Sequence, residues 1–174
     1  MLKKVVVIGP ESTGKSTLSE ALASHFSCPW VPEFARPYID ALERPYHYED
    51  LLQIAKGQVQ LEEMKSANAH SLLICDTDLH VIQVWSQHKY GKVDDWILEQ
   101  IKSRTYDLYL LTDIDIPWQE DPQREYPEPG MRQYFFNIFH RLVASKGIPY
   151  EKISGTLPQR MERAIEVIEK NIGI

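Results

Sequence analysis

The sequence predicts a three-layer α/β domain, in which helices cover both faces of a parallel five-stranded sheet. Apolar runs of strand length alternate along the chain with segments whose apolar residues recur at helical spacing. Three of these runs are apolar almost throughout, as is typical of strands buried on both faces. Because strands that alternate with helices pair in parallel through right-handed crossovers, we expect one such sheet with the strand order 2-3-1-4-5.

The expected elements follow from composition and spacing. The strands are Lys4–Ile8, a short stretch near Trp30, Ser71–Cys75, Asp107–Leu111 and Ile148–Ile153. The helices are Lys15–Phe26, Glu49–Ala67, Asp78–His88, a helix capped by Asp94 that ends at Ser103, Met131–Ser145, and a last helix that Pro158 opens and that runs to Asn171.

Size and composition suit one globular domain over residues 1–174. The net charge of -6, from 25 acidic and 19 basic residues, argues against nucleic acid or an anionic membrane as the main partner. The first apolar run ends after four residues, which indicates a strand rather than a secretion signal, and no stretch approaches membrane-spanning length. With two distant cysteines, these features favour a cytoplasmic protein, and homo-oligomerisation is left open.

The segment GPESTGKST follows the first strand, opens a helix and fits the pattern G-x-x-x-x-G-K-[ST]. Glycines at both ends let the loop wrap a phosphate, and the helix N-terminus adds partial positive charge. Lys15 is expected to reach the β- and γ-phosphates and Ser16 to bind Mg²⁺. We therefore expect a P-loop NTPase fold that binds ATP, with GTP left open, through Gly9, Glu11, Ser12, Thr13, Gly14, Lys15, Ser16 and Thr17.

A P-loop alone leaves the reaction open. A switch GTPase needs N-K-x-D after a strand, whereas the fourth strand here ends in LLTDIDIP. An AAA machine needs a helical lid domain and an arginine from a neighbour, for which this chain is short. A kinase needs an acceptor pocket with a carboxylate base and a cover that excludes water, and both have candidates in the sequence.

Acidic residues follow two strands that we expect beside the P-loop strand. Glu33 in VPEFARPY is a candidate base, and Arg36 could contact the transferred phosphoryl group, hold Glu33, or form a surface salt bridge. Asp76 in LLICDTD occupies the Walker B position and is expected to orient Mg²⁺. Asp78 could bind sugar hydroxyls, act as a base or cap a helix. These residues leave open whether Glu33, Asp76 or Asp78 takes the proton.

The proline-rich stretch around residues 117–131 is expected to form a lid rather than a solvated loop. Arg124 and Arg132 flank its proline cluster, and arginine suits phosphate oxygens, so we expect Arg124 at the transferring phosphate and Arg132 at the nucleotide.

Two further predictions concern the residues that would contact the adenine ring and the acceptor ring. Gly155 and Thr156, in the loop after the fifth strand, are expected to present backbone groups to adenine. Most aromatic residues in the middle of the chain should pack in the core. One or two should stack on a flat, cationic acceptor, with Tyr38 and Trp85 as candidates.

Five motifs together, GPESTGKS, VPEFAR, IAKGQ, LLICDTD and WQEDPQR, resemble the ribosylnicotinamide kinase family, whose domain forms the C-terminal end of the bacterial regulator NadR. The resemblance covers nearly the whole chain in order. It implies phosphorylation of nicotinamide riboside at its 5′-hydroxyl by ATP with Mg²⁺, which yields nicotinamide mononucleotide for NAD salvage. It also implies the following roles: phosphate and metal binding by Gly14, Lys15, Ser16 and Thr17, acceptor and metal binding by Glu33, Asp76 and Asp78, and a lid role for Arg124.

The sequence also departs from the full regulator. It lacks H-x-G-H, so adenylyl transfer is not expected, and it has no room for the regulator's other two domains. Two alternatives to the riboside kinase are kept: a kinase for another nucleoside or small alcohol, and a nucleotide-dependent binding or switch ATPase.

Overall fold

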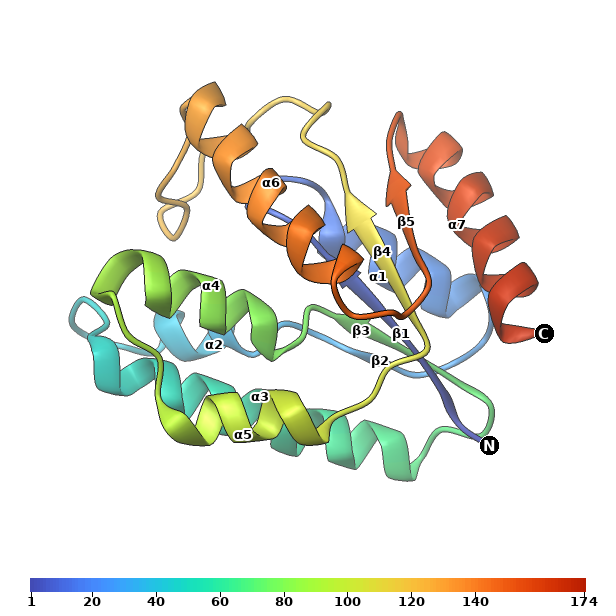
Figure 1. The fold of residues 1–174 in the computed structure, drawn as a ribbon, viewed down its shortest axis with the longest axis horizontal. Helices are drawn as coiled ribbons and strands as arrows, with labels where there is room; N and C mark the ends of the chain where they lie inside the picture. The colour runs from blue at the N-terminus through green and yellow to red at the C-terminus, as the bar shows by residue number, and fades with distance from the viewer.

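The computed structural model describes all 174 residues and has one five-stranded sheet, in which each strand pairs in parallel with its neighbours. The order is β2-β3-β1-β4-β5, so the predicted fold class and strand order are confirmed (Figure 1). The strands are β1 (Lys3–Ile8), β2 (Trp30–Val31), β3 (Leu72–Asp76), β4 (Leu108–Thr112) and β5 (Tyr150–Ile153).

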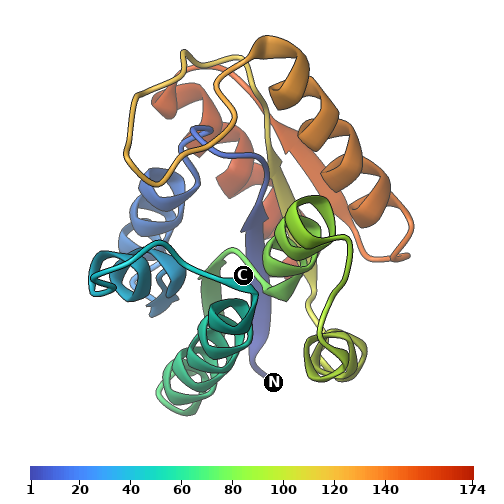
Figure 2. The same cartoon turned by 90° about the vertical axis from the view of Figure 1, so that its left-hand side faces the viewer.

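Helices cover both faces of this sheet (Figure 2). On one face lie α1 (Lys15–His25) and α7 (Leu157–Ile172). On the other face lie α3 (Tyr48–Ala67), α4 (Leu79–Tyr90) and α6 (Pro129–Ala144), with α5 (Asp95–Ser103) packed on α3 and α4, and the short α2 (Ala35–Asp40) beside α3. None of these helices has the length and hydropathy needed to cross a membrane.

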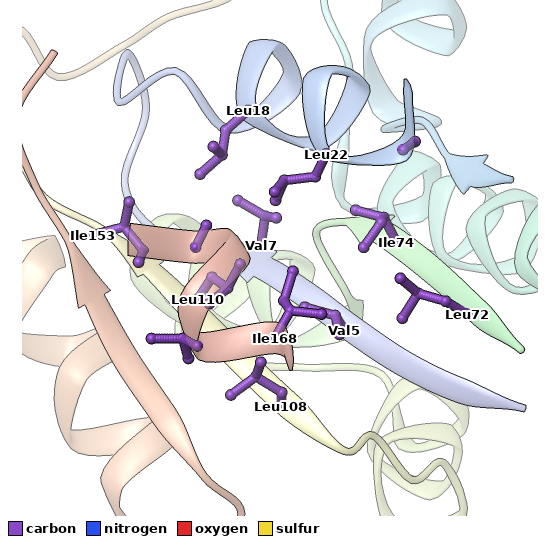
Figure 3. Close-up of a cluster of buried hydrophobic side chains, with 13 residues drawn as sticks. Val5, Val7, Leu18, Leu22, Leu72, Ile74, Leu108, Leu110, Ile153 and Ile168 are labelled. Carbon is purple, nitrogen blue, oxygen red and sulfur yellow. The ribbon is translucent and has the colours of Figure 1, made fainter. Parts of the chain in front are cut away.

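The alternation of side chains along β1 explains why the strand is apolar throughout. Val5 and Val7 point to the face covered by α1 and α7, where they join the cluster drawn in Figure 3. Val6 and Ile8 point to the opposite face, below α4 and α6. All four are 0% exposed, because successive side chains of a central strand enter different core layers.

Two local features differ from the sequence prediction. Helix α2 was not expected, because six residues are too few to show a helical apolar period. Helix α6 begins at Pro129 rather than Met131, so the last part of the expected lid is helical. Proline suits the first helical turn, where no N–H is required.

The carboxyl ends of the strands meet at one edge of the sheet, where parallel α/β folds bind ligands. The P-loop follows β1 there, and the irregular segment 113–128 leaves the end of β4. Figure 2 shows this segment, drawn yellow to orange, arching over the P-loop. This edge therefore carries the candidate site.

Candidate active site

A cavity of about 460 Å³ lies at this edge. It is lined by the P-loop, the segment 113–128, the loop after β5, and helices α2, α4 and α6. Its volume is in the usual range for small-molecule sites. Most of the predicted site residues line this cavity: Gly9, Glu11, Ser12, Thr13, Gly14, Lys15, Ser16, Thr17, Glu33, Arg36, Trp85, Arg124, Arg132 and Gly155.

The P-loop needs its glycines for different reasons. A Cβ at Gly9 would collide with the hydroxyl of Thr112 and lie 2.9 Å from the Thr112 carbonyl oxygen. Gly14 has a left-handed φ of 75°, and Ser12 is also left-handed, at 54°. Such left-handed turns form the concave backbone nests that bind anions. The loop therefore has the backbone shape of a phosphate cradle.

Side chains of the P-loop support this shape from behind. Thr13 is buried, and its hydroxyl donates to the Pro10 carbonyl at 2.8 Å and shares a hydrogen bond with the Thr112 hydroxyl at 2.7 Å. The Lys15 ammonium donates to the same Pro10 carbonyl at 2.8 Å, which holds its charge above the loop. Thr13 thus offers its backbone rather than its side chain to a ligand.

Ser16 and Asp76 form a pair of oxygen ligands beside the cradle. The Ser16 hydroxyl donates to Asp76 Oδ2, while the buried Asp76 Oδ1 has no partner. Burial, followed by the nearby charge of Glu33, raises the pKa of Asp76 to about 6. Hydroxyl and carboxylate oxygens are the donors that Mg²⁺ prefers, and it completes its shell with water and substrate phosphate. These two residues therefore fit the expected magnesium site.

Glu33 faces the cavity from the segment between β2 and α2. The buried Gln58 of α3 holds the backbone on both sides of it: its Oε1 accepts from the Phe34 N–H at 2.8 Å, and its Nε2 donates to the Pro32 carbonyl at 3.3 Å. A Cβ at Gly57 would collide with the Phe34 ring. The IAKGQ motif therefore serves to position Glu33, a link that the sequence alone does not reveal.

The segment 113–128 is fastened to α2. Arg36 forms an ion pair with Asp121 at 2.9 Å, and Gln123 donates to the Asp40 carboxylate and to the Arg36 carbonyl. Arg36 therefore contacts the lid, rather than holding Glu33, which was one of the roles left open for it.

The segment is also fastened to the P-loop. Ser12 Oγ accepts from the Gln119 N–H at 2.9 Å and lies 3.4 Å from Arg124 Nη1. Glu11 Oε2 accepts from the N–H groups of Glu125 and Tyr126 at 3.1 and 3.4 Å. Glu11 and Ser12 were expected to bind nucleotide, but their side chains bind the lid in this structure. In this structure the segment 113–128, the expected lid, therefore lies against the P-loop.

Arg124 of the segment 113–128 and Arg132 of α6 reach the cavity from different elements. Arg124 Nη1 donates to the Gln119 carbonyl at 2.6 Å. Arg132, in the first turn of α6, donates to the carbonyls of Ile116 and Ser12 at 3.0 and 3.2 Å. Burial lowers the pKa of Arg132 from its usual value. Both guanidinium groups lie beside Ser12 of the P-loop.

The loop after β5 differs in detail from the prediction. The Gly155 N–H donates to Asp115 Oδ2 at 2.5 Å, so it is not free for a base in this structure. Thr156 does not line the cavity: it caps α7, with its N–H donating to Gln159 Oε1 at 2.9 Å. Capping accounts for Thr156 without a ligand.

Arg160 is a site residue that the sequence analysis missed. It is 3% exposed and donates to the Thr13 carbonyl at 2.6 Å, the Gly155 carbonyl at 2.9 Å and the Asp113 carbonyl at 3.1 Å. It therefore joins the P-loop to the ends of β4 and β5. No local signal marks it, because an arginine at this helical spacing is usually solvated.

Asp78 and Tyr38, both predicted to bind substrate, do not line the cavity. Asp78 is 2% exposed, caps α4 through the His80 N–H at 3.0 Å, and accepts from the Tyr109 hydroxyl at 2.9 Å. Burial alone would raise the pKa of Asp78, but His80 and Tyr109 lower it overall. The Tyr38 hydroxyl donates to Asp50 at 3.0 Å. Both side chains are thus committed to structural contacts.

The other end of the cavity is rich in aromatic rings. Trp85 and His88 come from α4, Tyr126 from the lid, and Phe135 from α6. The His88 ring lies 4.8 Å from that of Phe135 and 5.2 Å from that of Tyr126, both edge to face. Of these residues the sequence predicted only Trp85, because the others meet only once α4, α6 and the lid are assembled.

Comparisons with known proteins agree with this geometry. The trifunctional NAD biosynthesis/regulator protein NadR of Escherichia coli (strain K12) is 25% identical over 177 residues, which cover 99% of this chain and 43% of that protein. This chain therefore spans less than half the length of that relative.

Solved structures share the fold. Structures of NadR in complex with NR, and with NAD and AMP-PNP, superpose with TM-scores of 0.82 and 0.81 at 23% identity, covering 99% of this chain and 50% of theirs. Thymidylate kinase from Ehrlichia chaffeensis superposes with a TM-score of 0.65 at 15% identity, covering 95% of this chain and 98% of its own. The resemblance predicted from the motifs is thus confirmed as a similarity over nearly the whole chain. A family model described as an AAA domain matches residues 4–160, and the chain belongs to that family.

Proposed function

We propose that this protein is an ATP-dependent kinase that phosphorylates nicotinamide riboside at its 5′-hydroxyl. The observation that carries the proposal is one continuous cavity, with a phosphate cradle at one end, aromatic rings at the other and Glu33 in its wall. Phosphoryl transfer depends on positioning and electrostatics, which such an arrangement supplies.

At the phosphate end, three cations would neutralise the transferring group. Lys15 leaves the Pro10 carbonyl to bind the β- and γ-phosphate oxygens, and the lid brings Arg124 and Arg132 to the same side. As the bond to the leaving group breaks, negative charge grows on the β–γ bridging oxygen and the β-phosphate, so fixed cations there stabilise the transition state more than the ground state. The closed lid also excludes water, which would otherwise compete with the acceptor.

Glu33 is the base that the geometry favours. It lines the cavity, whereas the Asp76 carboxylate is engaged by Ser16 and Asp78 is enclosed by its structural partners. The 5′-oxygen would attack the γ-phosphorus as its proton passes to Glu33, and the bond to the β–γ bridging oxygen would break. Mg²⁺ held by Ser16 and Asp76 would supply charge neutralisation between the phosphates.

The aromatic end of the cavity and the similarity to NadR both support this choice of acceptor. A nicotinamide ring that carries a positive charge can stack on aromatic faces such as Trp85 and Tyr126. The similarity to NadR, whose structure was solved in complex with NR, supports the same acceptor class. A different nucleoside is the second candidate, since the fold is also shared with a deoxyadenosine kinase from M. mycoides, which superposes with a TM-score of 0.65 at 12% identity.

The test is ADP release with ATP and Mg²⁺, measured with and without nicotinamide riboside, together with mass spectrometry of the product. Riboside-dependent ADP release and a product one phosphate heavier are expected. A panel of other nucleosides serves as the comparison. Release of ADP that ignores every acceptor would overturn the kinase proposal in favour of a nucleotide-dependent switch.

A further inference from the structure

Behind the aromatic end of the cavity, four side chains meet at the hydroxyl of Tyr46, which lies in the loop before α3. Trp85 Nε1 donates to this hydroxyl at 2.8 Å, and the hydroxyl donates to Glu125 Oε1 at 2.7 Å. Lys89 also donates to the hydroxyl, and its ammonium contacts Glu125 Oε1 at 2.7 Å. We call Tyr46, Trp85, Lys89 and Glu125 the Tyr46 junction.

The hydroxyl uses its full bonding capacity. A phenol offers one hydrogen and two lone pairs, and here the hydrogen goes to Glu125 while the lone pairs accept from Trp85 and Lys89. Burial, and next the hydrogen bond to Glu125, raise the pKa of Tyr46 above its usual value, so the phenol keeps its proton. The Tyr46 ring also lies edge to face with the Trp85 indole, with centroids 4.8 Å apart.

The junction connects two walls of the site without entering it. Trp85 is the only one of its members that lines the cavity. Glu125 belongs to the lid, between the cavity-lining Arg124 and Tyr126, and its backbone N–H is bound by Glu11 of the P-loop at 3.1 Å. A contact that orients the Trp85 indole therefore also holds the lid residue next to Arg124.

We propose that Tyr46 is a positioning residue that couples the acceptor subsite to lid closure: an acceptor seated against Trp85 stabilises the junction, and the junction holds the lid over the nucleotide. This proposal rests on the proposed function, because it needs an acceptor at Trp85. Since coupling between two sites is reciprocal, acceptor and nucleotide each tighten the binding of the other.

The test compares the Kd of AMP-PNP with and without saturating nicotinamide riboside by isothermal titration calorimetry, with Mg²⁺ present. The ratio of the two values is the coupling factor, which we expect to be about fivefold or more in the native protein. Tyr46→Phe keeps the ring and removes only the hydroxyl. We expect it to lower the coupling factor by about fivefold, the worth of one hydrogen bond. The Kd of AMP-PNP alone should change less than the Kd measured with nicotinamide riboside, because Tyr46 does not line the cavity and only the second value includes a junction stabilised by the acceptor.

Tyr48→Phe is the matched control. Tyr48 lies two residues away, packs edge to face on Tyr90 and takes no part in the junction. Glu125→Ala should reduce coupling as Tyr46→Phe does, and the double variant should lose little more, because both act on one contact.

Each outcome bears on one proposal or both. A reduced coupling factor in Tyr46→Phe and Glu125→Ala, with Tyr48→Phe unchanged, supports the junction. An unchanged factor in Tyr46→Phe, or an equal loss in Tyr48→Phe, overturns it while leaving the riboside kinase intact. If the native protein binds AMP-PNP but no riboside, the proposed function fails and the coupling role fails with it.

Discussion

The two ends of the cavity are built in opposite ways. The cradle of the phosphate end is one continuous segment, Gly9–Thr17, which presents mainly backbone, and Arg124 and Arg132 reach it from other elements at Ser12. The acceptor end collects side chains from the β2–α2 connection, from α4, from the lid and from α6. One end is a local structure with a fixed shape, and the other exists only after distant elements have packed.

This difference separates two properties of the protein. The phosphate end suits any nucleoside triphosphate, because all triphosphates offer the same oxygens to a backbone cradle. In the proposed reaction, the acceptor end would select which hydroxyl reaches the γ-phosphate, because side chains there contact the shape and charge of the acceptor ring. Substitutions should therefore affect all substrates alike at one end, and affect the acceptor selectively at the other.

The largest effect should come from Lys15→Ala at the phosphate end. The ammonium is a charge that no backbone group replaces, so we expect kcat/KM to fall by at least about a thousandfold for every acceptor. Thermal unfolding should change little, since Lys15 makes only one hydrogen bond, to Pro10. An active variant, assayed by ADP release, would contradict the proposed role of the loop.

Glu33→Gln tests the proposed base, which would accept the proton of the acceptor hydroxyl as that hydroxyl attacks the γ-phosphate. The amide keeps the shape of the side chain but accepts no proton, so we expect kcat to fall by about a hundredfold or more while the KM for ATP stays near its native value. Glu43→Gln, at an exposed loop position, is the matched control. Full turnover in Glu33→Gln would return the role of base to Asp76 or Asp78.

The features that could be predicted from the sequence are mostly those of the phosphate end and the sheet, and the features that could not are mostly those of the acceptor end. The strand order and the cradle were predictable, because apolar runs and the G-x-x-x-x-G-K-[ST] spacing are local signals. Ser16 and Asp76 were predictable as a pair once strand neighbours were assumed, and their hydrogen bond agrees.

The rest of the site depends on tertiary contacts. Arg160 gives no local sign of the three carbonyls that it binds, and His88 and Phe135 become neighbours only through the packing of α4 on α6. Asp78 illustrates the same limit: of the roles left open for it, the structure shows helix capping, because its carboxylate is enclosed by His80 and Tyr109. A short sequence pattern does not tell which way a side chain points.

Trp85→Phe should affect the acceptor more than the nucleotide. The smaller ring loses stacking area and the hydrogen bond to Tyr46, so we expect the KM for nicotinamide riboside to rise about five- to tenfold. The KM for ATP should rise less, because the nucleotide feels this change only through the Tyr46 junction. Trp96→Phe, on α5 and outside the cavity, is the matched control. Equal changes in both KM values for Trp85→Phe would contradict the division between the two ends.

Asp50→Asn should have the smallest effect on turnover of these substitutions, because Asp50 lies outside the cavity. We expect it to change the free energy of unfolding instead. Asp50 lies in the first turn of α3 and accepts from Arg44 at 2.7 Å, the His47 N–H at 2.7 Å and the Tyr38 hydroxyl at 3.0 Å. The hydrogen bond from Arg44 is the main reason that the pKa of Asp50 is lowered, and burial opposes it. Since Arg44 is 49% exposed, solvent screens the pair, and we expect a loss of about 1–2 kcal/mol in the free energy of unfolding at pH 7.

The sign of the pH dependence follows from this lowered pKa. The stabilisation by Asp50 is fully present above its unfolded pKa of about 3.9 and is lost as the pH falls through the lower folded value. Urea unfolding of the native protein and of Asp50→Asn should therefore differ most at neutral pH and converge below about pH 4. A gap that stays constant on acidification would show that Asp50 contributes through shape alone. The contribution of Asp50 to stability would then be independent of its charge, like that of the uncharged hydrogen bond between Thr13 and Thr112 behind the P-loop.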